Sequence, residues 1–209
     1  MSKPAFDFAH NVFINCPIDK KYDPLFHAMV FTVHLLGFRP RCSREASDSG
    51  HVRLKKIMNI IAGCKFGIHD ISRVELTRGL PRFNMPFELG IDLGFHRCGN
   101  ARCKAKIHLV VDAKQWRYQK ILSDISGQDI FAHHDDPSTI VTIVRDWLRT
   151  ATKARDMPGG DVIFIEYKRF RRDLPKICRK SHLRMNQITY ADYSHLVAKW
   201  VKTKYKKKP

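Results

Sequence analysis

Several short motifs that mark common enzyme classes are missing from this sequence. Neither GxGxxG nor the P-loop pattern GxxxxGK(S/T) occurs, which argues against a dinucleotide-binding dehydrogenase and a P-loop nucleotide hydrolase. The serine-nucleophile motif GxSxG and the zinc-protease motif HExxH are also missing. No cysteine and histidine spacing matches a set of metal ligands. We therefore expect no metal site and no resident cofactor.

Paired cysteines and long apolar runs are missing as well. The six cysteines, at positions 16, 42, 64, 98, 103 and 178, form no CxxC pair. The longest apolar run, residues 28–36, is broken by Thr32 and His34 and is too short to span a bilayer. The first residues show no signal-peptide pattern. These features predict a cytoplasmic protein with reduced thiols and no membrane partner.

Acidic residues are few. The 209 residues include 20 Asp and Glu against 38 Lys and Arg, and the resulting positive field attracts phosphates, nucleotides and nucleic acid. The length suits one core with an appendage. We predict an α/β domain over residues 1–152 and a basic C-terminal extension, packed on it, over residues 153–209.

Short apolar runs alternate with amphipathic stretches through the first half of the chain. The pattern predicts strands at residues 11–15, 38–42, 65–71 and 106–111, and helices at residues 22–36, 52–63 and about 87–95. Such alternation implies right-handed crossovers and a sheet covered on both faces. The predicted fold class is α/β, with a doubly wound, flavodoxin-like or Rossmann-like parallel sheet.

The second half is less regular. We predict helices at residues 115–125 and 139–150, a linker over residues 153–160, and a further strand at residues 161–166 (DVIFIE). The remainder, through Trp200, reads as basic helical material that ends in a lysine-rich tail.

Polar residues follow the first and third predicted strands. Ligands of open parallel sheets bind beyond the carboxyl ends of the strands, usually between strands one and three. Residues 15–19 (NCPID) and 69–73 (HDISR) follow these strands, and Glu88 lies at the start of the next helix. We expect the three segments to face one crevice, with Glu88 as its key carboxylate.

Ordinary structural roles compete with this interpretation. Glu88 in a first helical turn would cap free backbone N–H groups, and Asp70 would pair with Arg73. Gly90 and Gly94 favour a functional role for this helix. Glycine inside a helix lowers its stability by about 1 kcal/mol relative to alanine, so its presence needs a reason. Close approach of a strand or a ligand would explain both glycines.

The order of these segments resembles that of nucleoside 2-deoxyribosyltransferases and the related TIR-type NAD glycohydrolases. The likeness runs through VFINCPID (12–19), GFRPRC (37–42), GIHDIS (67–72), PFELGIDLGF (86–95) and IHLVV (107–111), which is roughly the first half of the chain. The segments FINCPID, HDIS, RFNMPFELG and SDISGQDI also look like those of an uncharacterised bacterial TIR-like family, some of whose relatives serve in phage defence.

This resemblance implies roles for individual residues. Glu88 would be the nucleophile or the stabiliser of an oxocarbenium ion, assisted by Asp70. The substrate-binding residues would be Asn15, Cys16, Pro17, Ser72, Arg73 and Asn84. Residues 82–86 (RFNMP) depart from the Gly-Thr type of approach in the transferases, which bears on the substrate more than on the fold.

The C-terminal part concentrates positive charge among aromatic residues. The candidate nucleic-acid contacts are Lys168, Arg169, Arg171, Arg172 and Lys180. The alternative is a solvated basic face with no ligand.

Two classes of function follow from these patterns. The first is an N-glycosidase acting on a nucleotide, with NAD as the leading substrate, in bacterial defence and as a homo-oligomer or with a defence partner. Hydrolysis, base exchange and cyclisation would share the same residues. The second is a non-catalytic module that senses a nucleotide in the cleft or holds nucleic acid on the basic face. A nuclease is disfavoured because no acidic metal-binding cluster is recognisable.

Overall fold

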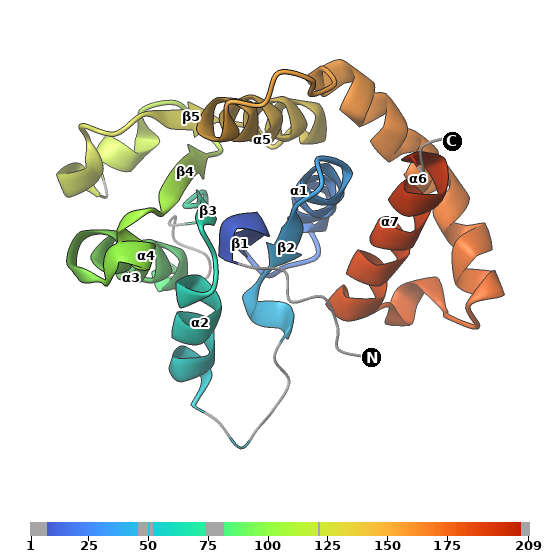
Figure 1. The fold of residues 1–209 in the computed structure, drawn as a ribbon, viewed down its shortest axis with the longest axis horizontal. Coiled ribbons are helices and arrows are strands. Elements are labelled where there is room, and N and C mark those ends of the chain that lie inside the picture. The colour runs from blue at the N-terminus through green and yellow to red at the C-terminus, as the bar shows by residue number, and fades with distance from the viewer. Residues whose placement is uncertain (1–7, 46–49, 51, 74–81, 121, 206–209) are drawn as a thin grey trace.

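A single parallel sheet organises the protein (Figure 1). The computed structural model describes residues 8–45, 50, 52–73, 82–120 and 122–205. The sheet has the order β2-β1-β3-β4-β5, and all its strand pairs are parallel. The strands are β1 (Asn11–Asn15), β2 (Arg39–Arg41), β3 (Phe66–Asp70), β4 (Ile107–Asp112) and β5 (Ile130–Ala132). This order confirms the predicted doubly wound fold, with its reversal of winding between β1 and β3.

Helices cover both faces of the sheet (Figure 1). The helices α1 (Asp23–Leu35) and α5 (Pro137–Thr152) pack on one face, and α2 (Arg53–Ala62), α3 (Asn84–Cys98) and the short α4 (Ala101–Lys104) lie on the other. Two long helices, α6 (Gly160–Lys180) and α7 (Tyr190–Tyr205), pack outside α1. No helix in the described ranges is long and apolar enough to cross a membrane.

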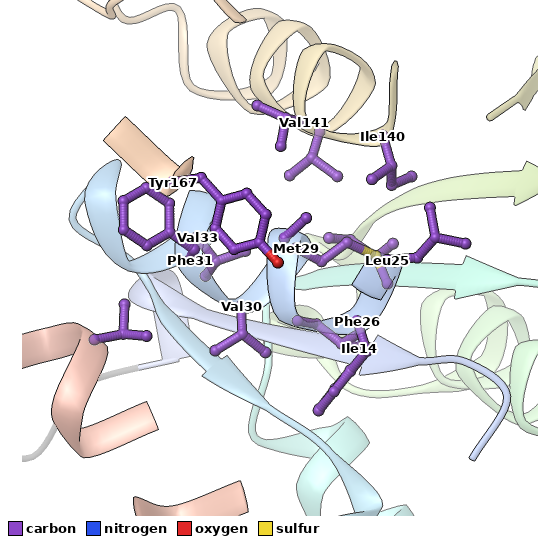
Figure 2. Close-up of a cluster of buried hydrophobic side chains, with 14 of the residues drawn as sticks. Ile14, Leu25, Phe26, Met29, Val30, Phe31, Val33, Ile140, Val141 and Tyr167 are labelled. Atoms are coloured by element: carbon purple, nitrogen blue, oxygen red, sulfur yellow. The ribbon is translucent and has the colours of Figure 1, made fainter. Parts of the chain in front are cut away.

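The main core lies between the sheet and α1. Ile14 of β1 faces Leu25, Met29 and other buried side chains of α1 (Figure 2). The neighbouring Phe13 packs with α2 on the opposite face. Both faces of β1 are therefore buried, which explains why the strand reads as one apolar run without alternation.

The C-terminal helices share this core. The ring of Phe31 on α1 lies 5.5 Å from the rings of Tyr167 and Phe170 on α6 and 5.8 Å from Trp200 on α7. These aromatic side chains belong to the same buried cluster as Ile14. Figure 2 shows Phe31 and Tyr167 of this cluster. Burial of rings at these separations stabilises both the sheet layer and the extension.

Two predicted elements of the second half are wrong. Residues 161–166, predicted as a strand, form the first turns of α6, because the buried residues Ile163, Tyr167 and Phe170 continue a helical spacing. Residues 115–125 were predicted as one helix, but their described residues (115–120 and 122–125) form only the 3-10 turns Arg117–Lys120 and Ser123–Ile125. The three-residue strand β5 that follows was not predicted, since so short a run carries little pattern.

Gly67 allows α3 to lie close against β3. A Cβ atom at this position would stand 2.5 Å from Asp92 Oδ2 and 2.8 Å from His69 Nε2, and both side chains are fully buried. By contrast, a Cβ atom at Gly90 would meet nothing within 4 Å.

We expect Gly67→Ala to lower the free energy of unfolding by roughly 1–3 kcal/mol, because the buried neighbours must shift. Gly90→Ala, on the exposed face of α3, should instead gain about 1 kcal/mol from helix propensity. Urea unfolding of both variants measures the difference. Equal stability of the two variants would contradict the packing described for Gly67.

Candidate functional site

A cleft of about 420 Å³ opens at the carboxyl end of β1, beside the start of α3. It lies at the point where the winding of the sheet reverses, which is the usual ligand position in this fold. Its lining residues are Asn15, Cys16, Ile18, Ser43, Arg53, Arg82, Asn84, Met85 and Glu88.

Glu88 is the carboxylate of this cleft. Its residue is only 8% exposed, and burial raises the pKa of its carboxyl to about 7, against the opposing effect of the Arg53 charge. Glu88 therefore changes its charge near neutral pH, as general acids and bases often do.

Two expectations about Glu88 and its helix need correction: the helix-capping role of Glu88 and the close packing at Gly90 and Gly94. The helix α3 begins at Asn84, three residues before the predicted start, so its first turn holds no acidic residue and Glu88 is not a helix cap. Gly90 and Gly94 are exposed and a Cβ atom at either would meet nothing within 4 Å. The close approach of a strand expected at these glycines is therefore not found among the described residues, and it occurs at Gly67 instead.

Asn15 is held in a fixed orientation beside Glu88. Its Nδ2 donates to the backbone oxygen of Met85 at 2.8 Å and lies 3.1 Å from His69 Nδ1. Both amide hydrogens are therefore committed, and only Oδ1 can accept from a ligand in the cleft. The contact also places the hydrogen of His69 on Nε2, because Nδ1 must accept.

A buried polar cluster lies behind Asn15. His69 Nε2 is 3.0 Å from Asp92 Oδ2, and Asp92 Oδ1 is 3.1 Å from Lys106 Nζ and 3.2 Å from His108 Nε2. The hydrogen bonds from His108 and His69 and the charge of Lys106 hold the pKa of Asp92 well below its ordinary value despite burial. Burial lowers the pKa of His69, so this imidazole is neutral. The cluster thus fixes Asn15 through a neutral histidine.

Asp70, the second predicted catalytic carboxylate, does not line the cleft. Its side chain is fully buried, where the Tyr22 hydroxyl donates to it, the backbone N–H of Ser72 donates at 2.8 Å, and His133 Nε2 lies 2.9 Å away. Hydrogen bonding from His133 and the other donors lowers the pKa of Asp70 against the effect of burial. The ion pairs of the described residues do not include the alternative pairing with Arg73, whose Nη2 instead lies 3.9 Å from Asp135 Oδ1. Asp70 therefore fixes the end of β3.

Of the other predicted site residues, some line the cleft and others lie outside its described lining. Cys16 and Asn84 line the cleft, and burial raises the pKa of the Cys16 thiol well above its ordinary value, so the thiol is not a nucleophile at neutral pH. Pro17 and Ser72 are buried and lie outside the set of cleft-lining residues that the structure describes. The buried Ser72 Oγ has no hydrogen-bond partner within the described ranges.

Two cations of the cleft were not predicted. Arg53 comes from the start of α2, and Arg82 precedes α3, with its Nη1 at 3.3 Å from Asp19 Oδ2. Arg53 could not be identified from the sequence, because its place in the cleft depends on α2 beginning at the rim of the sheet. Residues 74–81, which lead towards Arg82, lie outside the described residues.

The five candidate nucleic-acid contacts all lie on α6. Two of them have acidic neighbours: Arg169 pairs with Glu166, and Arg172 Nε lies 3.8 Å from Asp173 Oδ1. Lys168 Nζ stands 5.1 Å from the centroid of the Phe164 ring, and Lys180 is in the last turn. Because part of this charge is neutralised locally, nucleic-acid binding through α6 stays a prediction.

Comparisons of the chain with protein-family models, with curated proteins and with solved structures found no match. The likeness to deoxyribosyltransferases and TIR-type enzymes therefore stays a hypothesis. Within the described ranges, no group of three or more His, Cys, Asp and Glu side chains is arranged to hold a metal ion.

We expect Asp92→Asn to destabilise the fold by roughly 3–5 kcal/mol, because it leaves the Lys106 ammonium buried without its counter-charge. Lys106→Met in the same chain should restore part of this loss. Thermal unfolding of the two single variants and the double variant measures the coupling.

The stability lost in Asp92→Asn should also depend on pH. The folded-state pKa of Asp92 is depressed, so its stabilisation is present above the unfolded pKa and is lost as pH falls towards the folded pKa. The gap between wild type and Asp92→Asn should therefore narrow below about pH 4. A gap that widens on acidification would contradict the charged pair.

Proposed function

We propose that this protein cleaves the N-glycosidic bond of a nucleotide, with NAD as the leading substrate and Glu88 acting at the anomeric carbon. The observation that carries the proposal is the position of Glu88, which lines a 420 Å³ cleft at the switch point of the sheet with its pKa raised to about 7. The likeness to phage-defence relatives makes nucleotide depletion during infection the proposed role in the cell.

The chemistry of the bond explains the need for a carboxylate. As the bond between the base and the sugar breaks, its electron pair leaves with the base and positive charge develops on the anomeric carbon. An ionised Glu88 stabilises that charge or attacks the carbon directly. Water, a second base or a hydroxyl of the same substrate then completes hydrolysis, exchange or cyclisation.

The neighbouring groups suit a nucleotide. Asn15 offers Oδ1, which accepts from a ribose hydroxyl, and the cationic Arg53 and Arg82 are available for phosphate oxygens. The Asp92 cluster holds Asn15 through His69, so this acceptor is oriented before substrate binds. Asp70 acts as a support for the end of β3 and does not contact substrate.

A binding module is the second candidate, and one observation favours it. Glycosidases with two working carboxylates place both beside the bond, whereas Glu88 is the only acidic side chain among the described residues that line this cleft. The same Asn15, Arg53 and Glu88 set could hold a nucleotide without cleaving it.

We expect Glu88→Gln to lower the rate of base release from NAD by at least about 100-fold, because the neutral amide cannot stabilise the cationic sugar. Glu166→Gln is the matched control, since Glu166 is another buried glutamate but lies on α6 away from the cleft. Released nicotinamide is measured by chromatography, and NAD binding by calorimetry. Full activity of Glu88→Gln would overturn the enzymatic assignment, and tight NAD binding by wild type without release would favour the binding module.

The pH profile gives a separate test. Because the ionised form of Glu88 is required, kcat/KM for base release should rise with pH and level off above an apparent pKa of about 7. Arg53→Gln should move this midpoint to higher pH, since the Arg53 charge favours the carboxylate. Lys55→Gln, on an exposed position of the same helix, should leave the midpoint unchanged. A profile that falls with rising pH would contradict a role for the anion.

A further inference from the structure

A second cavity, of about 430 Å³, lies where the C-terminal helices meet the first part of the chain. We call it the junction cavity, and it is bounded by the start of α1, the 3-10 turn Ser43–Glu45, α6, α7 and the segment between them. Ser43 lines the Glu88 cleft while Arg44 lines the junction cavity, so the two hollows are neighbours but have separate walls.

Positive charge is in excess in the junction cavity. Its wall carries the cations Lys20, Arg44 and Arg171 against a single carboxylate, Asp23. Asp23 Oδ1 lies 3.2 Å from Arg44 Nη1, and the buried Arg44 Nε has no acceptor among the residues that the structure describes. In the described part of the chain, no carboxylate lies within ion-pair distance of Arg171 or Lys20. A buried charged donor and two unpaired cations favour an anionic occupant.

His27 sets the position of Arg171. Burial and the charge of Arg171 lower the pKa of His27 to about 4, so the imidazole is neutral at pH 7. Its Nδ1 lies 3.3 Å from Arg171 Nη1 and accepts from it, and its ring stacks on Tyr193 at 4.2 Å between centroids. The guanidinium is thereby oriented by a neutral group and keeps its full charge for a ligand.

The remainder of the wall is apolar with a few amide and hydroxyl groups. The Arg44 guanidinium covers the Phe26 ring at 4.4 Å, and Leu174 lies near the centre of α6. Met185, 47% exposed, and the amide of Asn186 lie on the segment that joins α6 to α7. A ligand with a charged end and a flat or apolar end would match both halves of this wall.

We propose that the junction cavity binds a small organic phosphate of the nucleoside monophosphate class, with the phosphate between Arg44 and Arg171 and the base towards Met185 and Asn186. The volume falls within the range of about 300–1,000 Å³ usual for small-molecule sites. This site does not include Glu88, and the inference stands whether or not the protein cleaves a nucleotide.

Binding at this place would also join two parts of the chain. Arg44 belongs to the turn after β2, whereas Arg171 belongs to α6. A phosphate held by both guanidinium groups would therefore stabilise the docking of the C-terminal helices on the sheet layer. We expect AMP to raise the midpoint of thermal unfolding, and the rise should continue with the logarithm of the AMP concentration above Kd.

The test is calorimetric titration of the full chain with AMP, adenosine and inorganic phosphate. AMP should bind, adenosine should bind at least roughly tenfold more weakly, and phosphate alone should compete with AMP. Arg171→Gln and Arg44→Gln should each weaken AMP binding roughly tenfold. Arg172→Gln is the matched control, because it removes the same charge from the next residue, whose side chain is 77% exposed, and should change affinity less than about twofold.

The variants also locate the ligand. Weakened AMP binding in Arg53→Gln, together with wild-type binding in Arg171→Gln, would place AMP in the Glu88 cleft and overturn the proposal. Equal affinities of Arg171→Gln and Arg172→Gln, or no AMP binding to the wild type, would overturn it too. If circular dichroism shows that Arg44→Gln is misfolded, Lys20→Gln replaces it, since Lys20 is exposed and has no ion-pair partner among the described residues.

Discussion

The buried carboxylate of Asp92 joins the helix α3 to two neighbouring strands of the sheet. It comes from α3 and contacts His69 of β3, His108 of β4 and Lys106, which immediately precedes β4. Lys106 adds bonds from its ammonium to the backbone oxygens of Ile61, at 2.8 Å, and Cys64 at the end of α2. Such a set is costly to desolvate, so its value lies in fixing one arrangement of the helices on this face.

The position of Glu88 follows from that arrangement. Glu88 and Asp92 are one turn apart on α3, yet their pKa values shift in opposite directions. Asp92 is surrounded by donors, which favour its charge, whereas Glu88 is buried with a single cation, Arg53, acting on it. When the pKa values of two carboxylates are shifted apart in this way, one is a structural anion and the other titrates near neutral pH.

The sequence predicted the sheet and the segments at its rim. It did not predict which side chains of these segments face the cleft and which are buried. The alternation of elements and the switch-point rule placed Asn15, Asp70 and Glu88 in neighbouring segments, because strand ends meet at one edge in a parallel sheet. Whether Asp70 faces the cleft depended on Tyr22, the residue just before α1, and on His133, the residue just after β5. Such long-range partners leave no periodic pattern, and β5 itself is too short to carry one. The strand predicted at residues 161–166 failed because a short apolar run fits a strand and a buried helix equally well.

The aromatic cluster around Phe31 bears on the order in which the chain acquires its structure during synthesis. Phe31 belongs to the first helix, but it is covered by Tyr167, Phe170 and Trp200, which are made more than a hundred residues later. The outer surface of α1 therefore stays uncovered on the ribosome until α7 has emerged, and exposed aromatic surface of this kind promotes association between nascent chains. Folding of the N-terminal strands and completion of the core are thus separated in time by most of the length of the protein.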